Sequence, residues 1–413
     1  MSKDFSVPKL RFPEFNSKWE KKKIGDIAEK VNSGKTPLGG ESVYVENGVL
    51  FIRSQNVLDN KLSFENSTYI TEATNNTMKN SVVIANDILL NITGASLGRS
   101  CVVPKDFNIG NVNQHVCIIR LDKKNDPAFV QPIFASVKGQ NIFTSLQTGS
   151  GREGLNFQSI RGISLHFPAL PEQTKIANFL TSVDKKLQIL KQKKTLLEQY
   201  KKGVMQQIFS QQIRFKDDNK NDFPVWEEKM LGEVFYSEKG KGISKNKIDA
   251  NGKFDCVLYG ELYTKYKEVI FDIVSKTNEN DGIKSKIGDL LIPSSTTTTG
   301  IDLANVTALN KADVLLGGDI TVLRSNENIN NIFYAYYLSN HKKEEIASYA
   351  QGSTIVHLYY SHIKEMNIQI PCHEEQTKIA NFLSSIDDKI NHCQSQIEKT
   401  EIWKKGLLQQ MFV

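Results

Sequence analysis

The chain has 413 residues, which is long enough for two or three domains with separate hydrophobic cores. Its composition, 39% hydrophobic and 24% charged, is that of a soluble protein, and no apolar run approaches the ~18 residues that a membrane span needs. The net charge of +6 suggests a polyanionic partner.

The positive charge is concentrated in the first half of the chain. Residues 1–171 carry 20 Lys and Arg against 15 Asp and Glu, and residues 172–209 carry 8 against 3. In contrast, residues 210–374 carry 19 against 23, and residues 375–413 carry 5 against 5. Charge alone therefore favours nucleic-acid binding by the first half and gives no such indication for the second.

Cysteine usage and the N-terminus point to the same compartment. The five cysteines are odd in number and form no CxxC pair, which argues against a disulfide framework. The N-terminal residues lack the apolar core of a signal peptide. We therefore expect a cytoplasmic protein that does not associate with a membrane.

The first 171 residues show mainly short β-strand patterns. Runs rich in β-branched and aromatic residues are bounded by Gly, Asn, Asp or Pro, which is typical of strands separated by turns. Helical segments are expected at residues 127–146 and, in the second half, at residues 331–350. Each region is predicted to be mixed α/β or β-rich, with a strand order that the patterns do not determine. The clearest strand patterns are at residues 49–52, 81–84, 87–90 and 115–119.

A long amphipathic helix is predicted for residues 172–209. Its apolar residues recur at spacings of 4 and 3, which is the pattern of one helix face. At about 1.5 Å per residue the helix would be roughly 57 Å long, too long to be stable alone. We expect it to pair with another helix, or to dock a partner, through Ile176, Leu180, Val183, Leu187, Leu190 and Leu197.

The second half of the chain repeats the first. Residues 375–412 align with residues 172–209 over 38 positions without a gap, at a constant offset of 203, and both copies contain EQTKIANFL. A period near 200 residues indicates duplication of a whole unit. Matches outside the helices are Trp19 with Trp226, Asp87 with Asp289, and Arg120 with Arg324. The second helix is expected to pair, or to dock a partner, through Ile379, Leu383, Ile386, Ile390, Ile397, Trp403 and Leu407.

This repeat predicts an α+β fold with four parts. Two mixed α/β regions, residues 1–171 and 210–374, would be separated by two long coiled-coil helices, residues 172–209 and 375–413. The repeat is circular, because the first dozen residues correspond to residues 211–222 that follow the first helix.

Catalytic and metal-binding motifs are absent or incomplete. Residues 33–36 read Ser-Gly-Lys-Thr, but Glu29 stands where a phosphate-binding loop needs its first glycine. Cys372-His373 and His392-Cys393 contain four potential zinc ligands, but neighbouring residues on a helix point about 100° apart. We therefore predict no catalytic residue, no metal site and no cofactor in this chain.

Two pairs of loops at equivalent positions are rich in small polar residues. Residues 91–98 and 293–300 follow matching strands and carry hydroxyl or amide groups that can contact phosphates or base edges. Residues 149–156 and 352–360 occupy equivalent positions of the repeat but carry different polar residues. Such a difference is expected if the two regions recognise different short DNA sequences. Ordinary Ser/Thr turns, and a flexible surface loop at residues 239–245, are alternative interpretations. The candidate DNA contacts are Lys35, Thr36, Arg53, Gln55, Asn91, Thr93, Ser96, Arg99, Ser150, Arg152, Asn156, Lys241, Ser244, Lys245, Ser294, Ser295, Thr296, Thr297, Thr298, Thr354, His357, Tyr359 and Tyr360.

Four features together carry a family resemblance. They are the LRFPEF opening followed by Trp19-Glu20, the Ser-Gly-Lys-Thr-Pro turn at residues 33–37, the Phe-Pro-x-x-Pro-Glu-Gln start of the first helix, and the duplicated EQTKIANFL. Over nearly its full length the chain resembles the specificity subunit of a type I restriction-modification system. The arrangement of the repeat is specific to this family, whereas each short motif alone is not.

The resemblance implies a division of labour. The globular regions would be target recognition domains for double-stranded DNA. The two long helices would pair antiparallel, which gives the internal repeat a pseudo-two-fold axis, and would act as a spacer and dock the modification subunits. Two modification subunits would use S-adenosylmethionine to methylate adenine, and restriction subunits would hydrolyse ATP, with magnesium, and cut DNA. In that family the specificity subunit is not itself catalytic.

Several expectations follow from this arrangement. Two different recognition domains facing one duplex predict an asymmetric, bipartite target with a fixed gap. Glu374 stands where the first copy has Pro171, so we expect the second helix to start at a different angle. Two other hypotheses stay open: a self-contained DNA-modifying enzyme with unfamiliar motifs, and a coiled-coil scaffold without a DNA role.

Overall fold

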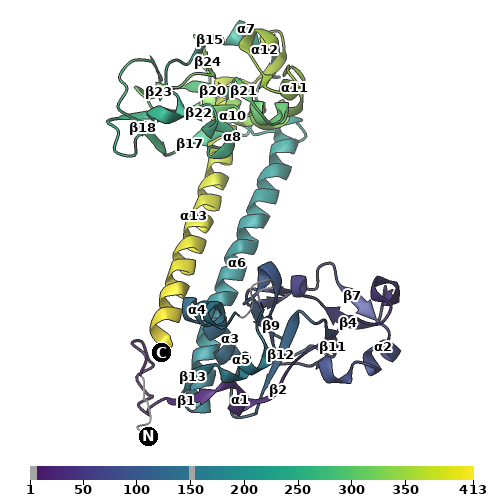
Figure 1. The fold of residues 1–413 in the computed structure, drawn as a ribbon. Helices are drawn as coiled ribbons and strands as arrows, with labels where there is room; N and C mark the ends of the chain where they lie inside the picture. The colour runs from purple at the N-terminus through teal and green to yellow at the C-terminus, as the bar shows by residue number, and fades with distance from the viewer. Residues whose placement is uncertain (1–6, 148–153) are drawn as a thin grey trace. The chain divides into compact units, whose positions relative to one another are not determined.

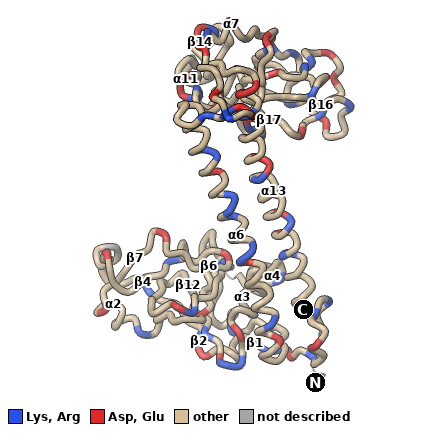
Figure 2. Tube along the Cα trace, turned by 180° about the vertical axis from the view of Figure 1, so that it is seen from behind, with Lys and Arg blue, Asp and Glu red and all other residues tan. Residues whose placement is uncertain are grey.

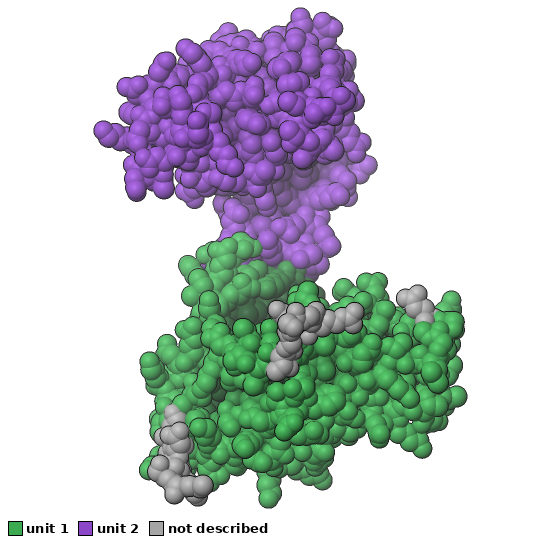
Figure 3. Space-filling view, in the orientation of Figure 1, with its two compact units in different colours: residues 1–192, 394–413 green, residues 193–393 purple. Residues whose placement is uncertain are grey.

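The computed structural model describes residues 7–147 and 154–413 and has an α+β fold (Figure 1; Figure 2 gives the view from behind). The chain forms two compact units. Unit 1 comprises residues 1–192 and 394–413, and unit 2 comprises residues 193–393 (Figure 3). Each unit therefore contains one globular region together with part of each long helix.

The globular region of unit 1 is built on two sheets. Its strands are β1 (Glu20–Lys23), β2 (Ala28–Ser33), β3 (Tyr44–Val45), β4 (Val49–Ile52), β5 (Val57–Leu58), β6 (Lys61–Leu62), β7 (Thr68–Ile70), β8 (Val82–Val83), β9 (Ile88–Asn91), β10 (Ser100–Val102), β11 (Gly110–Val112), β12 (Val116–Leu121) and β13 (Ser164–Phe167). A four-stranded antiparallel sheet has the order β10-β9-β12-β2. A five-stranded sheet has the order β3-β7-β4-β11-β8, in which β4 and β11 run parallel. The pairs β1 with β13 and β5 with β6 complete the region.

Buried strands account for the strongest sequence patterns. Every residue of β4 and β9 is buried, as near-continuous apolar runs predict. The predicted strands at residues 49–52, 87–90 and 115–119 correspond to β4, β9 and β12, and β8 lies within residues 81–84.

The described part of this region also contains the short α-helices α1 (Ile24–Ile27), α2 (Glu72–Asn76), α3 (Pro127–Ala135), α4 (Val137–Leu146) and α5 (Phe157–Gly162). Two helices, α3 and α4, take the place of the single one predicted at residues 127–146. The reason is Ser136, which has an extended backbone and whose side chain accepts a hydrogen bond from the Gly139 amide at 3.2 Å. It therefore ends one helix and caps the next.

Unit 2 repeats this architecture. Its strands are β14 (Glu227–Met230), β15 (Tyr236–Lys239), β16 (Phe254–Val257), β17 (Val269–Ile270), β18 (Ser275–Thr277), β19 (Ile283–Lys284), β20 (Asp289–Pro293), β21 (Ser295–Thr296), β22 (Thr307–Leu309), β23 (Leu315–Leu316), β24 (Ile320–Arg324), β25 (Val356–His357) and β26 (Asn367–Ile370). The sheet orders are β15-β24-β20-β22-β17 and β18-β16-β23-β19, with pairs β14-β26 and β21-β25. As with β4 and β11, β16 and β23 run parallel. Its short helices are α7 (Leu231–Val234), α8 (Glu261–Thr264), α9 (Gly300–Leu303), α10 (Asn331–Tyr336), α11 (Lys343–Ser348) and α12 (Tyr360–Ile363).

The two long helices are α6 (Leu170–Phe209) and α13 (His373–Met411), and they pair antiparallel within each unit. In unit 1 an ion pair joins Asp184 of α6 to Lys404 of α13. In unit 2 the Lys201 ammonium of α6 lies 2.8 Å from the Asp387 carboxylate of α13. Asp184 and Asp387 are equivalent positions of the repeat, as are Lys201 and Lys404, so the same pairing register occurs twice.

The apolar faces of these helices are buried in different surroundings. Near the helix ends they join the cores of the globular regions: Ile176 and Leu407 pack with Trp19 and Phe129 in unit 1. Farther along α6 in unit 1, helix packs against helix alone. Buried residues of the expected set are Ile176, Leu180, Val183, Leu187, Leu190, Ile379, Leu383, Ile386, Ile390, Ile397 and Leu407, and Leu197 is half-buried.

Trp403 lies at the edge of the helix pair and not inside it, so of its two predicted roles the position does not support helix pairing. Its side chain is 47% exposed and makes an edge contact with Phe179 at a ring-centroid distance of 6.0 Å. The inward position is its neighbour Lys404, because the spacings of 4 and 3 run through Ile397, Thr400 and Lys404. A lysine that pairs with an aspartate of the other helix thus occupies a core position, and the larger apolar residue is displaced to the edge.

A buried glutamate anchors the start of each long helix. In unit 1 the Glu172 carboxylate accepts two hydrogen bonds of 2.7 Å from Arg11 and one of 3.2 Å from the Trp19 indole. In unit 2 Glu375 accepts bonds of 3.1 and 2.6 Å from Arg214 and one of 2.9 Å from Trp226. The LRFPEF opening and the Trp-Glu motif are therefore parts of one repeated contact.

The two helix starts make the same contacts despite the missing proline. The Gln173 side chain donates to the Pro168 carbonyl at 2.9 Å and accepts from the Asp126 amide at 2.9 Å. Gln376 donates to Pro371 at 2.8 Å and accepts from the Asn330 amide at 2.8 Å. The expected change at the second start does not appear in these hydrogen bonds.

Two kinds of feature are absent from the part of the chain that the structure describes. No helix there is long and apolar enough to cross a membrane. No three His, Cys, Asp or Glu side chains are grouped there in a way that could hold a metal ion.

Candidate nucleic-acid interface

Loops from both sheets of unit 1 meet at one end of that unit. In the four-stranded sheet β2 and β9 end where β12 begins, with Asn91 opposite Val116. In the five-stranded sheet β4 and β11 run parallel, so they also end together. Backbone hydrogen bonds join the loops that follow: the Gly34 amide donates to Asn113 at 3.1 Å, and the Asn113 amide donates to Ile52 at 3.1 Å. We call this end of the unit, residues 34–36, 53–56, 92–99 and 113–115, the loop end of unit 1.

Polar side chains are connected across the loop end of unit 1. The Thr36 hydroxyl donates to Gln114 at 2.8 Å, and the Gln114 amide lies 3.2 Å from His115. The other ring nitrogen of His115 lies 2.6 Å from the Thr93 hydroxyl. Thr36 and Thr93, predicted from separate motifs, are thereby brought together. Gln114 and His115 were missed, and the available signal was their position directly before a buried strand.

Unit 2 has an equivalent loop end, residues 240–245, 258–261, 294–299 and 317–319. The Gly240 amide donates to Ile320 at 2.8 Å, and the Gly317 amide donates to Val257 at 2.9 Å. Residues 351–360 join this end because β25 pairs with β21. The same backbone frame therefore carries different side chains in the two units.

An ion pair between neighbouring strands braces each frame. Arg120 of β12 donates to Asp87, beside β9, at 2.7 and 2.8 Å. Arg324 of β24 donates to Asp289 of β20 at 2.8 and 2.9 Å. The repeated Asp and Arg of the sequence are thus partners of each other.

Most candidate DNA contacts lie on the surface of the units. The exposed ones are Lys35, Thr36, Gln55, Arg99, Asn156, Lys241, Ser244, Lys245, Thr297, Thr298, Thr354 and Tyr359. The half-buried ones are Arg53, Thr93, Ser96, His357 and Tyr360. Ser150 and Arg152 lie outside the described residues.

Four candidates are buried and hold the loops together instead. Asn91 is fully buried, and its amide donates to the Ser54 carbonyl at 2.9 Å. The Ser294 hydroxyl lies 2.8 Å from that of Thr321, and Ser295 donates to Asp319 at 3.1 Å. Since these side chains, like that of Thr296, are closed to solvent, we remove Asn91, Ser294, Ser295 and Thr296 from the proposed DNA contacts.

Comparison with known proteins places this architecture in a family. Residues 16–199 and 225–400 each match the family described as "Type I restriction modification DNA specificity domain". The chain belongs to the type I restriction-modification specificity subunits. The two matched segments coincide with the two copies of the internal repeat.

Individual specificity subunits are similar to the chain over most of its length. The type I restriction enzyme MjaVIII specificity subunit of Methanocaldococcus jannaschii is 25% identical over 412 residues, covering 97% of this chain and 92% of the relative. The crystal structure of the S subunit from M. genitalium has a TM-score of 0.62 at 18% identity, covering 99% of both chains. A second solved chain, from a study of assembly and conformational transition of the type I R-M system, has a TM-score of 0.53 at 16% identity and covers 95% of this chain and 96% of that chain. These structures support the same fold.

The loop end of this specificity subunit has an aromatic cluster in unit 2. The rings of His357 and Tyr359 stack with centroids 5.6 Å apart, and the Tyr359 hydroxyl lies 3.1 Å from His357. The Lys239 ammonium lies 5.8 Å from the centroid of the Tyr359 ring. Stacked rings beside a cation form a surface suited to bases and phosphates.

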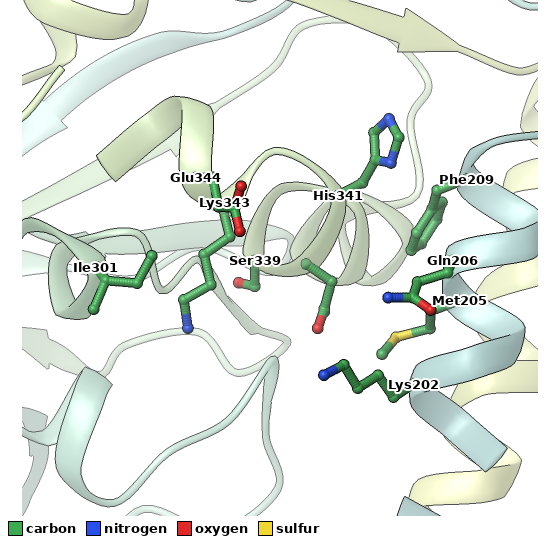
Figure 4. Close-up of a pocket in the computed structure, with 10 residues that line it drawn as sticks. Lys202, Met205, Gln206, Phe209, Ile301, Ser339, His341, Lys343 and Glu344 are labelled. Carbon is green, nitrogen blue, oxygen red and sulfur yellow. The ribbon is translucent and has the colours of Figure 1, made fainter. Parts of the chain in front are cut away.

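The specificity subunit also has one groove at a matching place in each unit. In unit 2 a cavity of about 520 Å³ lies between α6 and the segment before α11 (Figure 4). In Figure 4, Met205, Gln206 and Phe209 of α6 lie on one side and Ile301 and Lys343 on the other. In unit 1 a cavity of about 490 Å³ is lined by the equivalent Leu408, Gln409 and Phe412.

The rest of the groove lining differs between the copies. His341 lines the groove of unit 2, and partial burial and the nearby Lys342 charge lower the pKa of its imidazole. The corresponding segment of unit 1 contributes Ser136, Val137, Lys138, Asn141, Ile142 and Ser145.

Proposed function

We propose that this specificity subunit reads an asymmetric, bipartite site in double-stranded DNA, with one half-site for each unit. The observation that carries the proposal is the pair of loop ends: one backbone frame, repeated, with different side chains. Loops on a rigid scaffold are where binding residues concentrate. Because the exposed groups differ between Thr36, Gln114 and Arg99 on one unit and Lys241, Thr354 and Tyr359 on the other, the two half-sites should differ in sequence.

The long helices are proposed to set the gap between the half-sites. Each has about 40 residues and so extends about 60 Å along its axis. The ion pairs Asp184–Lys404 and Lys201–Asp387 support a fixed register for their pairing. A fixed register favours a gap of constant length.

We further propose that two identical modification subunits dock, one on each unit. Exposed helix residues need not match between copies for the fold to form, and none of residues 187–197 matches its counterpart in residues 390–400. Nearer the helix ends, however, exposed residues are identical. They include Asn178 and Asn381, Ser182 and Ser385, Lys186 and Lys389, Lys202 and Lys405, Gln206 and Gln409, and Gln207 and Gln410. Identity at exposed positions supports a partner surface that is used twice, and the matching grooves beside Gln206 and Gln409 support the same interpretation.

The chemistry is proposed to belong to the partners. Modification subunits would transfer a methyl group from S-adenosylmethionine to an adenine flipped out of the duplex. Restriction subunits would couple ATP hydrolysis, with magnesium, to DNA cleavage. The chain itself would position these subunits on the target.

Sequencing of modified bases tests this function. Host DNA is expected to carry adenine methylation at one asymmetric bipartite site, and deletion of the gene should abolish it while a plasmid copy restores it. Methylation unchanged by the deletion would contradict the proposal. Methyl transfer by the purified chain alone would instead indicate a self-contained enzyme, and no salt-dependent DNA binding with the partners present would indicate a scaffold.

Docking can be tested on the identical exposed residues. The double change Asn178→Arg with Ser182→Arg is expected to reduce the bound modification subunits from two to one, because bulky cations would fill one of two partner surfaces. Native mass spectrometry of the purified complex measures this stoichiometry. Asn381→Arg with Ser385→Arg should remove the other subunit, and all four changes should remove both.

The matched control is Gln188→Arg with Gln192→Arg, on an exposed stretch of α6 that is not repeated in α13. Surface changes of this kind alter stability by only about 0.5 kcal/mol, so all variants should stay folded. Two bound subunits in every variant would argue against this docking surface.

A further inference from the structure

Arginine side chains are unequally available in the two units. The chain has eight arginines, and two of them, Arg214 and Arg324, lie in unit 2. Arg214 is paired with the buried Glu375 at 2.6 Å. Arg324 is 5% exposed and is paired with Asp289 and Glu238. Both arginines of unit 2 are therefore committed to the fold.

Unit 1, in contrast, has arginines without a described side-chain partner at its loop end. Arg11 and Arg120 are paired with carboxylates like their counterparts in unit 2, and Arg161 donates to the Val31 carbonyl at 2.8 Å. Among the described residues, no side-chain hydrogen bond or ion pair engages Arg53 or Arg99. The two unpaired guanidinium groups of the described part of unit 1 thus belong to its loop end.

Arg53 is held where a reading residue would be needed. It follows β4 directly, and the Asn56 side chain accepts a hydrogen bond from its backbone amide at 3.0 Å. Its Nε is buried and has no hydrogen-bond partner within residues 7–147 and 154–413. A guanidinium N–H that is buried without a hydrogen-bond acceptor costs free energy, so an acceptor on a bound partner would stabilise it.

The equivalent position in unit 2 is Leu258. It follows β16, the counterpart of β4, and its amide donates to Glu261 at 3.1 Å as the Arg53 amide does to Asn56. The backbone is therefore held in the same way at both positions, and only the side chain differs. Leucine offers an apolar contact, such as one with a thymine methyl group, and no hydrogen-bond donor.

We infer that Arg53 reads a guanine in the half-site of unit 1, and that unit 2 reads its half-site without any arginine. Guanine presents O6 and N7 in the major groove, and the forked donors of arginine match this pair of acceptors. Unit 2 is left with lysines, hydroxyl groups and the His357–Tyr359 pair. The inference rests on the proposed DNA-reading function and adds which base is read, and by which unit.

The test uses the complete complex with its modification subunits and a library of DNA sites in which each position of the target is varied. Methylation of each site is measured by sequencing. The wild-type complex is expected to prefer guanine by roughly 10- to 100-fold at one position of the target. Arg53→Met keeps the alkyl part of the side chain and removes the hydrogen-bond donors, so this variant should methylate sites with any base at that position equally well. Arg53→Lys should retain part of the preference, and the other half-site should be read as before.

Arg99→Met is the matched control, because it removes the same charge from the same loop end. It is expected to lower methylation evenly across sequences, as loss of a phosphate contact does. The inference is overturned if Arg53→Met also lowers methylation evenly with every base preference intact, or if it changes the half-site of unit 2. A wild-type complex that methylates no bipartite site would overturn the proposed function as well.

Discussion

Replacing Asp289 with alanine is expected to lower the free energy of unfolding of unit 2 by about 3–5 kcal/mol. The Asp289 and Arg324 side chains are 1% and 6% exposed, and the pair joins the two central strands β20 and β24. Its hydrogen bonds to Asp289 raise the pKa of the Arg324 guanidinium. Arginine is not deprotonated in proteins even without such a partner, so the guanidinium would stay charged in the variant. Glu238 would be its one remaining carboxylate partner among those described.

The duplicated pair in unit 1 provides the control. Asp87→Ala removes the same carboxylate, but its partner Arg120 is 22% exposed and can be solvated. We therefore expect a smaller loss, about 1–2 kcal/mol. Hydrogen exchange resolved by mass spectrometry reports each unit separately, which matters because a chain of two units does not unfold in one step. An equal decrease in the free energy of unfolding in the two variants would show that burial of the arginine does not determine how much stability is lost.

Adding one heptad to both long helices is expected to lengthen the gap of the DNA target by one to three base pairs and leave both half-sites unchanged. Seven residues add about 10 Å of helix. The insertions belong after Lys193 and after Cys393, because the ion pairs Asp184–Lys404 and Lys201–Asp387 then keep their partners. Sequencing of the modified bases gives the gap directly.

An insertion in α6 alone is the informative comparison. It shifts one of the two ion-pair registers by a heptad while α13 stays unchanged, so we expect loss of helix pairing in part of the molecule and loss of methylation. Changed half-sites at a constant gap in the double insertion would refute the role of the helices as a spacer.

The repeat could be predicted from the sequence because its most constrained segment is nearly unchanged between copies. Glu172 and Glu375 are buried acceptors for an arginine and a tryptophan, which leaves little freedom to vary. The buried strands were also predictable, since apolar runs are bounded by turn residues. The meeting of the four loops at the loop end of unit 1 could not be predicted, because it depends on the parallel pairing of β4 with β11, two strands that are far apart in the chain.

Polarity is a poor guide to exposure at several positions of this chain. Ser295 and Thr296 form the buried strand β21, and Lys404 lies in the helix pair, because each has a polar partner that the sequence does not reveal. Conversely, the apolar Trp403 lies partly exposed at the edge of the helix pair. For Lys404 and Trp403 the informative signal is the strict spacing of 4 and 3, which passes through Lys404 and not Trp403.

The packing of Phe412 has a consequence for the order in which the protein is made. Its ring lies 5.4 Å from that of Phe129, and with Leu407 and Met411 it belongs to the same core as Trp19. Residues 407–412 must therefore emerge from the ribosome before the core of unit 1 can close, whereas residues 193–393 form the other core from one uninterrupted segment. The domain that is synthesised first completes its folding last, and until then its unfilled apolar surface depends on protection from aggregation.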